Sequence, residues 1–222
     1  MTQIKRFRWD DLEKARQLQL DAVKLHLPSP PVAWWDAQVF TPEGDLKEHI
    51  QCKCNSFVRN GLNLIATAGI APATTVRATG ATFADGTISY KTRTGTNSAA
   101  SWYGYSSTPT LYLGTSSTAE TLNDVNLGGV IATGWTIYAT VQTSSWNAGT
   151  RTLRTAIART FVNDTGLSVD LWEAGVSVTL QIIGSSTSFA DVLITRDVFP
   201  VVITVPASNG ITFTYNLDAV YP

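Results

Sequence analysis

The chain has 222 residues and a mass of 24.0 kDa, enough for one hydrophobic core of ordinary size and a smaller appended segment. Charged residues make up only 15% of it and the net charge is -1, so the composition excludes a strongly basic surface for nucleic acid or an anionic membrane. The basic N-terminus lacks the apolar segment of a secretory signal, and no segment approaches the roughly 20 apolar residues of a membrane-spanning helix.

The first predicted element is an amphipathic helix in the most highly charged part of the chain. Apolar residues from Leu12 to Leu25 recur at three- and four-residue spacings. Asp10 or Asp11 can cap its first turn, and Pro28 ends it. A helix of about 15 residues is marginal alone in water, so we expect it to dock either on its own domain or on a neighbouring subunit.

Three tryptophans flank this helix. Trp9, Trp34 and Trp35 are of the type that anchors protein interfaces, although they can equally be core residues. We therefore predict a helical and extended arm over residues 1–45, with these tryptophans as candidate interface residues, and a β-sandwich domain over residues 46–222.

Two cysteines follow the arm in a Cys-x-Cys arrangement. On a strand, Cys52 and Cys54 would point both thiols to the same face. Without a second Cys or His pair they make an incomplete metal site, so we expect no metal. Ordinary reduced thiols are the first interpretation, and a role in a metal site or an intersubunit disulfide is the alternative.

The middle of the chain gives weaker signals. Residues 56–66 predict a second helix and residues 86–93 a strand. Residues 94–124 read as a long loop rich in Gly, Ser, Thr and Tyr, which contains a short strand at 110–113. Strand alternation resumes over residues 133–142.

Aromatic residues gather in the long loop. Trp102, Tyr103 and Tyr105, together with Trp146, could stack on sugar rings or on a partner surface. The alternative is that they anchor the loop on the chain's own core. We take Trp102, Tyr103 and Tyr105 as candidate interface residues.

The strongest signal is a run of short alternating segments over residues 151–217. Apolar residues alternate there with Thr and Ser at period two, which places one set of side chains on each face of a strand. The connections are too short for crossover helices, so the pairing must be mostly antiparallel. The sequence thus predicts a mainly β chain, an antiparallel β-sandwich with an N-terminal helical arm.

Residue types for catalysis are sparse. The only histidines are His26 and His49, and the chain has no Gly-x-Ser-x-Gly turn, phosphate-binding loop or dinucleotide fingerprint. We expect no enzyme activity and no cofactor. A glycosidase needs two acids that flank one cleft, whereas single acids at turns usually bond local backbone amides. The acids weighed for that role are Asp164, Asp170, Glu173, Asp191 and Asp197.

Five short motifs stand out against this background. They are CNSFVRN at 54–60, RTFVNDTG at 159–166, VDLWEAG at 169–175, DVLITRDV at 191–198 and VPASNGITFTY at 205–215. Together they resemble a family of tailed-bacteriophage virion structural proteins. The resemblance spans residues 46–217, with residues 74–150 poorly matched, and its motifs are structural and not catalytic.

The resemblance implies a component of the phage tail, baseplate or neck, located in the virion, that assembles with other virion proteins and as a homo-oligomer. A capsid decoration protein and a glycan- or receptor-binding module are the alternatives. Within the motifs, Glu173 beside Trp172 and the Arg196-Asp197 pair at a strand end could form a charge-paired corner. An ordinary exposed ion pair, worth under about 1 kcal/mol, is the alternative there.

Overall fold

Strands dominate the fold. The computed structural model describes residues 3–25, 31–54, 78–82, 88–92, 109–121, 124, 126–183 and 187–220. Within them the chain is mainly β, with sheets of antiparallel strands and one N-terminal helix. This confirms the predicted fold class and is consistent with an antiparallel β-sandwich that carries an N-terminal helical arm. The helix predicted at 56–66 lies outside the described residues.

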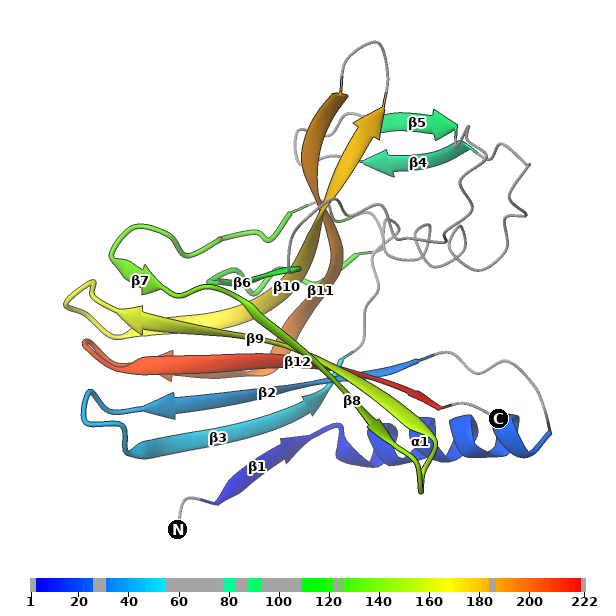
Figure 1. The fold of residues 1–222 in the computed structure, drawn as a ribbon. Helices are drawn as coiled ribbons and strands as arrows, with labels where there is room; N and C mark the ends of the chain where they lie inside the picture. Colours follow the sequence, from blue (N-terminus) through cyan, green and yellow to red (C-terminus); the bar gives the residue numbers. More distant parts are fainter. Residues whose placement is uncertain are drawn as a thin grey trace. The chain divides into compact units, whose positions relative to one another are not determined.

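The elements follow one another as Figure 1 shows. In chain order they are β1 (Ile4–Phe7), α1 (Trp9–Lys24), β2 (Val32–Phe40), β3 (Leu46–Lys53), β4 (Ala78–Thr82), β5 (Ile88–Thr92), β6 (Thr110–Gly114), β7 (Trp135–Ile137), β8 (Val141–Asn147), β9 (Thr152–Asn163), β10 (Val169–Ile183), β11 (Thr187–Val205) and β12 (Gly210–Val220).

The largest sheet has seven strands in the order β1-β3-β2-β12-β9-β7, with β8 also paired to β9. Its central strand is β12, which pairs antiparallel with β2 on one side and with β9 on the other. Phe213 therefore lies between Ala37 and Arg159. At the far edge β1 joins β3 in parallel, with Ile4 opposite His49.

One face of this sheet carries apolar core residues. Ile211, Phe213 and Tyr215 alternate along β12 and are at most 5% exposed. Trp35 is paired with Tyr215, is 1% exposed, and stacks on Phe213 with the ring centroids 5.3 Å apart. Trp35 is therefore packed in the core of its own chain, which was one of the two roles that the sequence left open.

The opposite face of the same sheet receives the helix α1, which contacts β2, β3 and β12. Leu12 is fully buried, and the Gln19 side chain donates to the backbone carbonyl of Asp218 at 3.0 Å. Of the two docking alternatives, the structure shows α1 on its own sheet. Asp10 and Asp11 do not cap the helix as predicted: it begins at Trp9, so both lie inside the first turn, where their charge complements the helix dipole.

The segment 31–45 differs from the extended arm that the sequence predicts. It contains β2, which lies between β3 and β12 in the sheet. The sequence pattern does not reveal this strand, because it is buried on both faces and therefore does not alternate, and because prolines precede it.

Smaller sheets complete the described chain. β6 pairs antiparallel with β10 in a three-stranded sheet of order β11-β10-β6, and β4 pairs with β5. Within the run of short alternating segments predicted over residues 151–217, Val169–Ile183 forms one 15-residue strand, β10. The chain divides into two compact units: Met1–Asn55 with Ala132–Leu171 and Pro200–Pro222, and Ser56–Ile131 with Trp172–Phe199.

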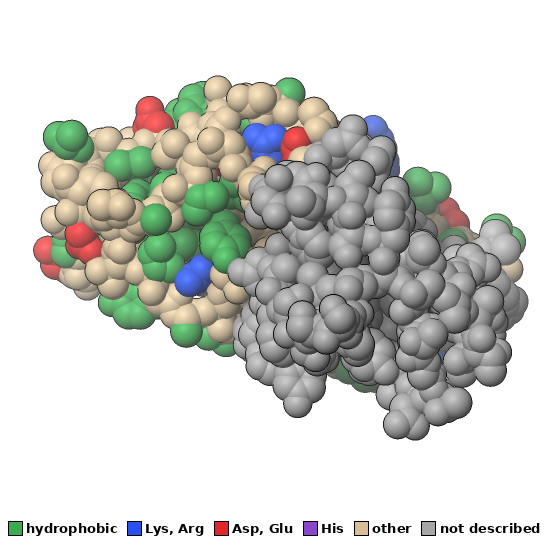
Figure 2. Space-filling view, turned by 90° about the horizontal axis from the view of Figure 1, so that it is seen from above, with side chains coloured by type: hydrophobic (Ala, Val, Ile, Leu, Met, Phe, Trp, Pro, Cys, Tyr) green, Lys and Arg blue, Asp and Glu red, His purple; other side chains and the backbone are tan. Residues whose placement is uncertain are grey.

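The face of the molecule seen in Figure 2 is mainly uncharged where the structure describes it. On the face seen in Figure 2, hydrophobic and neutral polar side chains cover the described part and charged ones are scattered. Large hydrophobic side chains reach solvent at Leu18, Tyr138, Val141, Trp146 and Leu167, each more than half exposed.

Candidate functional site

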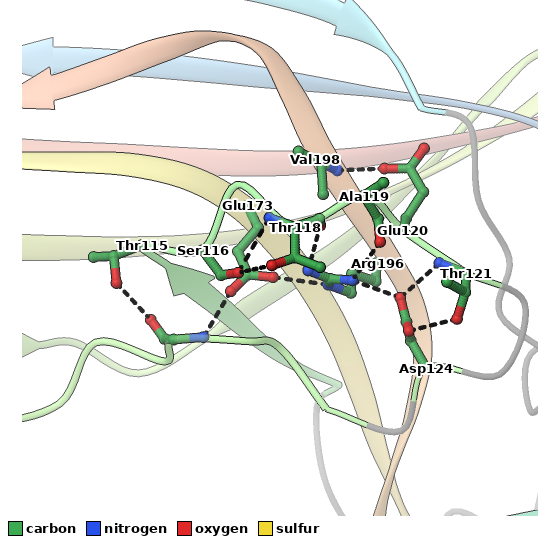
Figure 3. A network of polar contacts seen from close by, with 11 residues as sticks. Thr115, Ser116, Thr118, Ala119, Glu120, Thr121, Asp124, Glu173, Arg196 and Val198 are labelled. Carbon is green, nitrogen blue, oxygen red and sulfur yellow. Dashed lines mark hydrogen bonds and ion pairs between the residues drawn. The ribbon is translucent and has the colours of Figure 1, made fainter.

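The most deeply buried charges lie around Arg196, and Figure 3 shows their arrangement. Arg196 Nε donates to Glu173 Oε2 at 2.8 Å and Arg196 Nη1 donates to Asp124 Oδ2 at 2.6 Å. The Arg196 and Glu173 side chains are 4% and 0% exposed, so this is not an exposed ion pair. The predicted pairing of Glu173 with Arg196 is thus confirmed, but Arg196 lies within β11 and not at the strand end that the sequence predicts.

The Arg196 guanidinium also donates hydrogen bonds to backbone carbonyl groups. Its Nη2 donates to the Thr118 carbonyl at 2.9 Å and its Nη1 reaches the Ala119 carbonyl at 3.5 Å. Glu173 Oε1 accepts from the Gly129 amide at 2.9 Å. We call Arg196, Glu173 and Asp124, with the backbone groups they bind, the Arg196 network. It fastens the segment after β6 to β10 and β11.

That segment, residues 115–129, leaves β6 and returns beside it. The Thr115 amide donates to the Gly129 carbonyl at 2.8 Å, and the Ile131 amide donates to the Leu113 carbonyl at 3.0 Å. Glu120 adds a further tie, since its Oε2 accepts from the Val198 amide on β11 at 2.6 Å. We call residues 115–129 the β6 loop.

Room for the buried carboxylate comes from a glycine. Gly114 lies directly opposite Glu173 in the antiparallel β6–β10 pair. A Cβ atom at Gly114 would lie 2.7 Å from Glu173 Cγ, closer than packed carbon atoms approach. Glycine at this position lets the Glu173 side chain cross the neighbouring strand and reach the β6 loop.

The electrostatics of the Arg196 network keep its outer members charged. Burial by itself would raise the pKa of Asp124, but hydrogen bonds from Thr121 and Arg196 outweigh it and hold that pKa below its ordinary value. Burial likewise opposes the charge of Arg196, yet the pKa of Arg196 is raised because Asp124 and Glu173 both bind the guanidinium.

A second buried polar centre is Asn163, at the end of β9 and fully buried. Its Nδ2 donates to the carbonyls of Leu167 and Val205 at 2.7 and 2.8 Å. Its Oδ1 accepts from the Thr165 amide at 3.1 Å and from the Thr165 hydroxyl at 2.7 Å. One side chain thus fixes the 163–167 turn and joins it to the end of β11.

The third centre is Asp218 on β12, beneath α1. Arg154 binds it in a two-pronged pair, with Nε to Oδ1 at 2.6 Å and Nη2 to Oδ2 at 2.8 Å, and Arg16 of the helix adds a contact at 3.3 Å. Burial would raise the pKa of Asp218, but the two arginines outweigh it and lower that pKa. Two predicted interface residues meet here: Trp9 packs edge-on against Trp34 with centroids 6.2 Å apart, and Arg16 lies 5.8 Å from each ring.

The histidines and acids considered as catalytic residues are dispersed, and His49, Asp164 and Asp170 each bond to a neighbouring side chain. His49 Nε2 lies 2.6 Å from Asp36 Oδ2, which also accepts from Gln51 at 2.8 Å. Asp164 accepts from the Thr136 hydroxyl and Asp170 from the Thr204 hydroxyl, each at 2.6 Å. Asp197 is 4% exposed, while His26 and the side chain of Asp191 lie outside what the structure describes.

Cys52 and Cys54 are both buried thiols, and Cys52 Sγ lies 3.4 Å from the Lys53 carbonyl. Among the described residues, no three His, Cys, Asp or Glu side chains are grouped to hold a metal ion. In the same part of the chain, α1 lacks the length and apolar character needed to cross a bilayer. The loop aromatics Trp102, Tyr103 and Tyr105 lie outside the described residues, so their predicted interface role stays a prediction.

The sequence missed several members of these centres. Asp124 and the first part of the β6 loop lie in the stretch predicted as a long polar loop over residues 94–124, and Asp218 and Arg154 are far apart along the chain. A usable signal was the alternation of β12, because Asp218 occupies a strand position where a charge must find a partner. Comparisons with family models, curated proteins and solved structures return no match.

Proposed function

We propose that the chain is a structural subunit of a tailed-bacteriophage virion, a tail, baseplate or neck component that assembles through contacts with other virion proteins and with copies of itself. The observation that carries the proposal is the place of the residues behind the sequence resemblance. Asn163, Glu173 and Arg196 all belong to the resembling motifs, and all three are buried groups that hold a turn or a loop in one conformation.

The chemistry of these residues fits a shape-keeping role. A buried arginine that binds two carboxylates and two backbone carbonyls fixes the β6 loop against β10 and β11. Such a network favours the conformation that keeps its partners together, because separating them leaves a buried charge without a partner. A subunit that must fit its neighbours in an ordered particle needs loops held in this way.

Exposed apolar side chains support assembly as well. Tyr138 and Val141 are 54% and 58% exposed within the 138–147 stretch, and Trp146 is 54% exposed in the same stretch. Exposed aromatic side chains are common anchors of protein interfaces.

The test is to locate the chain in purified particles. Antibody against the chain, bound to intact virions and imaged by cryo-electron microscopy, should label the tail, the baseplate or the neck. Labelling of the head surface would instead favour the decoration-protein alternative, and binding to isolated host glycans would favour the receptor-binding one. A chain that is missing from purified virions would contradict the proposal.

The predicted interface aromatics give a second test. Replacing Trp102 and Tyr103 together with alanine should lower incorporation into particles, while the melting temperature of the isolated chain stays within a few degrees of wild type. A matched control is Leu18→Ala, which removes one exposed apolar side chain from a segment that is not a proposed contact site. Unchanged particle yield in the double variant would remove these residues from the interface.

A further inference from the structure

The strand β8 is open to solvent along its whole length. All seven residues of Val141–Asn147 are exposed, and among the described strands β8 pairs with β9 alone. The pairing is regular, from Val141 opposite Ala158 to Asn147 opposite Thr152. In such an antiparallel ladder every second residue turns its N–H and C=O groups away from its partner, so β8 presents a row of backbone donors and acceptors on its outer edge.

This edge lacks the features that keep strand edges from pairing. Natural sheets protect their edges with charged side chains, prolines, bulges or very short strands. The β8 sequence, Val-Gln-Thr-Ser-Ser-Trp-Asn, contains no charged residue and no proline, and its register with β9 runs without a bulge. The opposite edge of the sheet is different, because the four-residue strand β1 carries Lys5 and Arg6.

We propose that β8 is a pairing edge between two copies of this chain, joined antiparallel around a twofold axis at Ser144. Antiparallel pairing of a strand with its own copy brings together only residues of the same orientation, so a residue faces either itself or a residue an even number of positions away. Pairing over the full strand then places Ser144 opposite Ser144, Gln142 opposite Trp146, and Val141 opposite Asn147.

A second copy can occupy this edge without charge repulsion. Two β8 strands meet without any like-charge pair, whereas two β1 strands would bring their lysine and arginine side chains together. In the self-paired register each exposed Trp146 ring can cover the aliphatic part of Gln142 of the other copy, which removes apolar area from water at both ends of the joint. The joint extends the seven-stranded sheet of each copy across the axis. It does not depend on which particle the chain belongs to.

The register is tested by cysteine cross-linking of the full-length chain. Ser144→Cys places two thiols directly opposite each other, at a Cβ separation of about 4.5–5.5 Å that a disulfide can close with a small adjustment. Val141→Cys is the matched control, because the two copies of residue 141 would be six positions apart, roughly 20 Å. Mild oxidation should cross-link most of the Ser144→Cys chain into dimers and little of Val141→Cys or wild type, whose native thiols are buried.

Measuring the molecular mass of the protein in solution tests the dimer independently of cross-linking. Wild type should be a dimer at micromolar concentration, and Ser144→Lys, which sets two ammonium groups against each other, should raise the dissociation constant at least tenfold. Ser168→Lys, a lysine at another exposed position, should leave it unchanged. A monomeric wild type, a dimer indifferent to Ser144→Lys, or cross-linking as strong through residue 141 as through residue 144 would each overturn the proposal.

Discussion

At the scale of single residues, the molecule depends on buried polar groups whose partners lie far away in sequence. Arg196 reaches Asp124 and Glu173, and Asp218 reaches Arg154 and Arg16. An ion pair of this kind adds little net stability compared with a hydrophobic substitute. Removing one partner is nevertheless severe, because the remaining charge stays buried and unpaired.

Arg196→Met should therefore lower the free energy of unfolding by about 3–5 kcal/mol. The variant leaves Glu173, which is 0% exposed, without its cation, and releases the β6 loop carbonyls. Urea denaturation measures the change. Lys5→Met is the control, because it breaks an ion pair whose lysine is 60% exposed and should cost less than about 1 kcal/mol. Equal losses in the two variants would contradict a structural role for the Arg196 network.

Gly114→Ala tests the space that the Glu173 side chain occupies. The added methyl group would lie 2.7 Å from Glu173 Cγ, and overpacking of this kind costs about 1–3 kcal/mol. Gly149→Ala is the matched control, since its nearest neighbour would be Asn147 Oδ1 at 3.4 Å. Thermal melting should separate the two variants by several degrees, and a Gly114→Ala chain as stable as wild type would show that Glu173 can take another path.

Asp218 predicts a pH dependence with a definite sign. Its folded-state pKa is lower than its ordinary value of 3.8, so its contribution to stability is complete above about pH 4 and is lost as the pH falls through the lower folded-state value. Asp218→Asn should be less stable than wild type at pH 7 and lose less stability between pH 5 and pH 2. Denaturation curves at several pH values check this, and parallel pH profiles for the two chains would be the contrary result.

At the scale of elements, the sequence patterns predict some helices and strands and miss others. The helix α1 was predictable from its apolar spacing, and β9 and β12 from their alternation. β2 was hidden because a strand buried on both faces lacks alternation, and the length of β10 was hidden because Glu173 and Gly175 look like an interruption. The Glu173–Arg196 pair was visible in its motifs. Asp124 was not, because nothing local shows that a polar loop folds back onto a distant strand.

The docking of α1 on its own sheet is tested by truncating one side chain. Leu12 is fully buried whereas Leu18 on the same helix is 70% exposed. Leu12→Ala should cost about 2–5 kcal/mol. Leu18→Ala should change the free energy of unfolding by no more than about 0.5 kcal/mol. Should Leu12→Ala prove as mild as Leu18→Ala in chemical denaturation, the helix would not be part of the folded core.

At the scale of the whole molecule, the largest sheet is assembled from distant parts of the chain. β12 lies between β2 and β9, so the centre of the sheet joins segments from opposite halves of the sequence. Contacts of such long range slow folding and make it depend on all participants being present. Folding depends far less on an edge strand such as β1, which pairs with one neighbour only.

Ending the chain at Ser208, which removes β12, should therefore abolish cooperative folding. The truncation uncovers Trp35 and leaves β2 and β9 without their shared partner. Starting the chain at Arg8, which removes only β1, is the control and should give a soluble product with a cooperative melt. Circular dichroism on heating distinguishes the two truncated chains. A cooperative transition in the chain that ends at Ser208 would contradict the central role of β12.

The position of β12 also determines when the sheet can form during translation. Phe40 and Gly210 form the first pair of the β2–β12 register, and β2 leaves the ribosome long before its partner has been translated. At roughly 5–20 residues per second, the interval is on the order of ten seconds or more. Throughout that time a strand containing two tryptophans waits with one edge unmatched. The sheet cannot be completed until its central strand has been synthesised, and until then the nascent chain exposes an unpaired strand of the kind that is prone to pair with other chains.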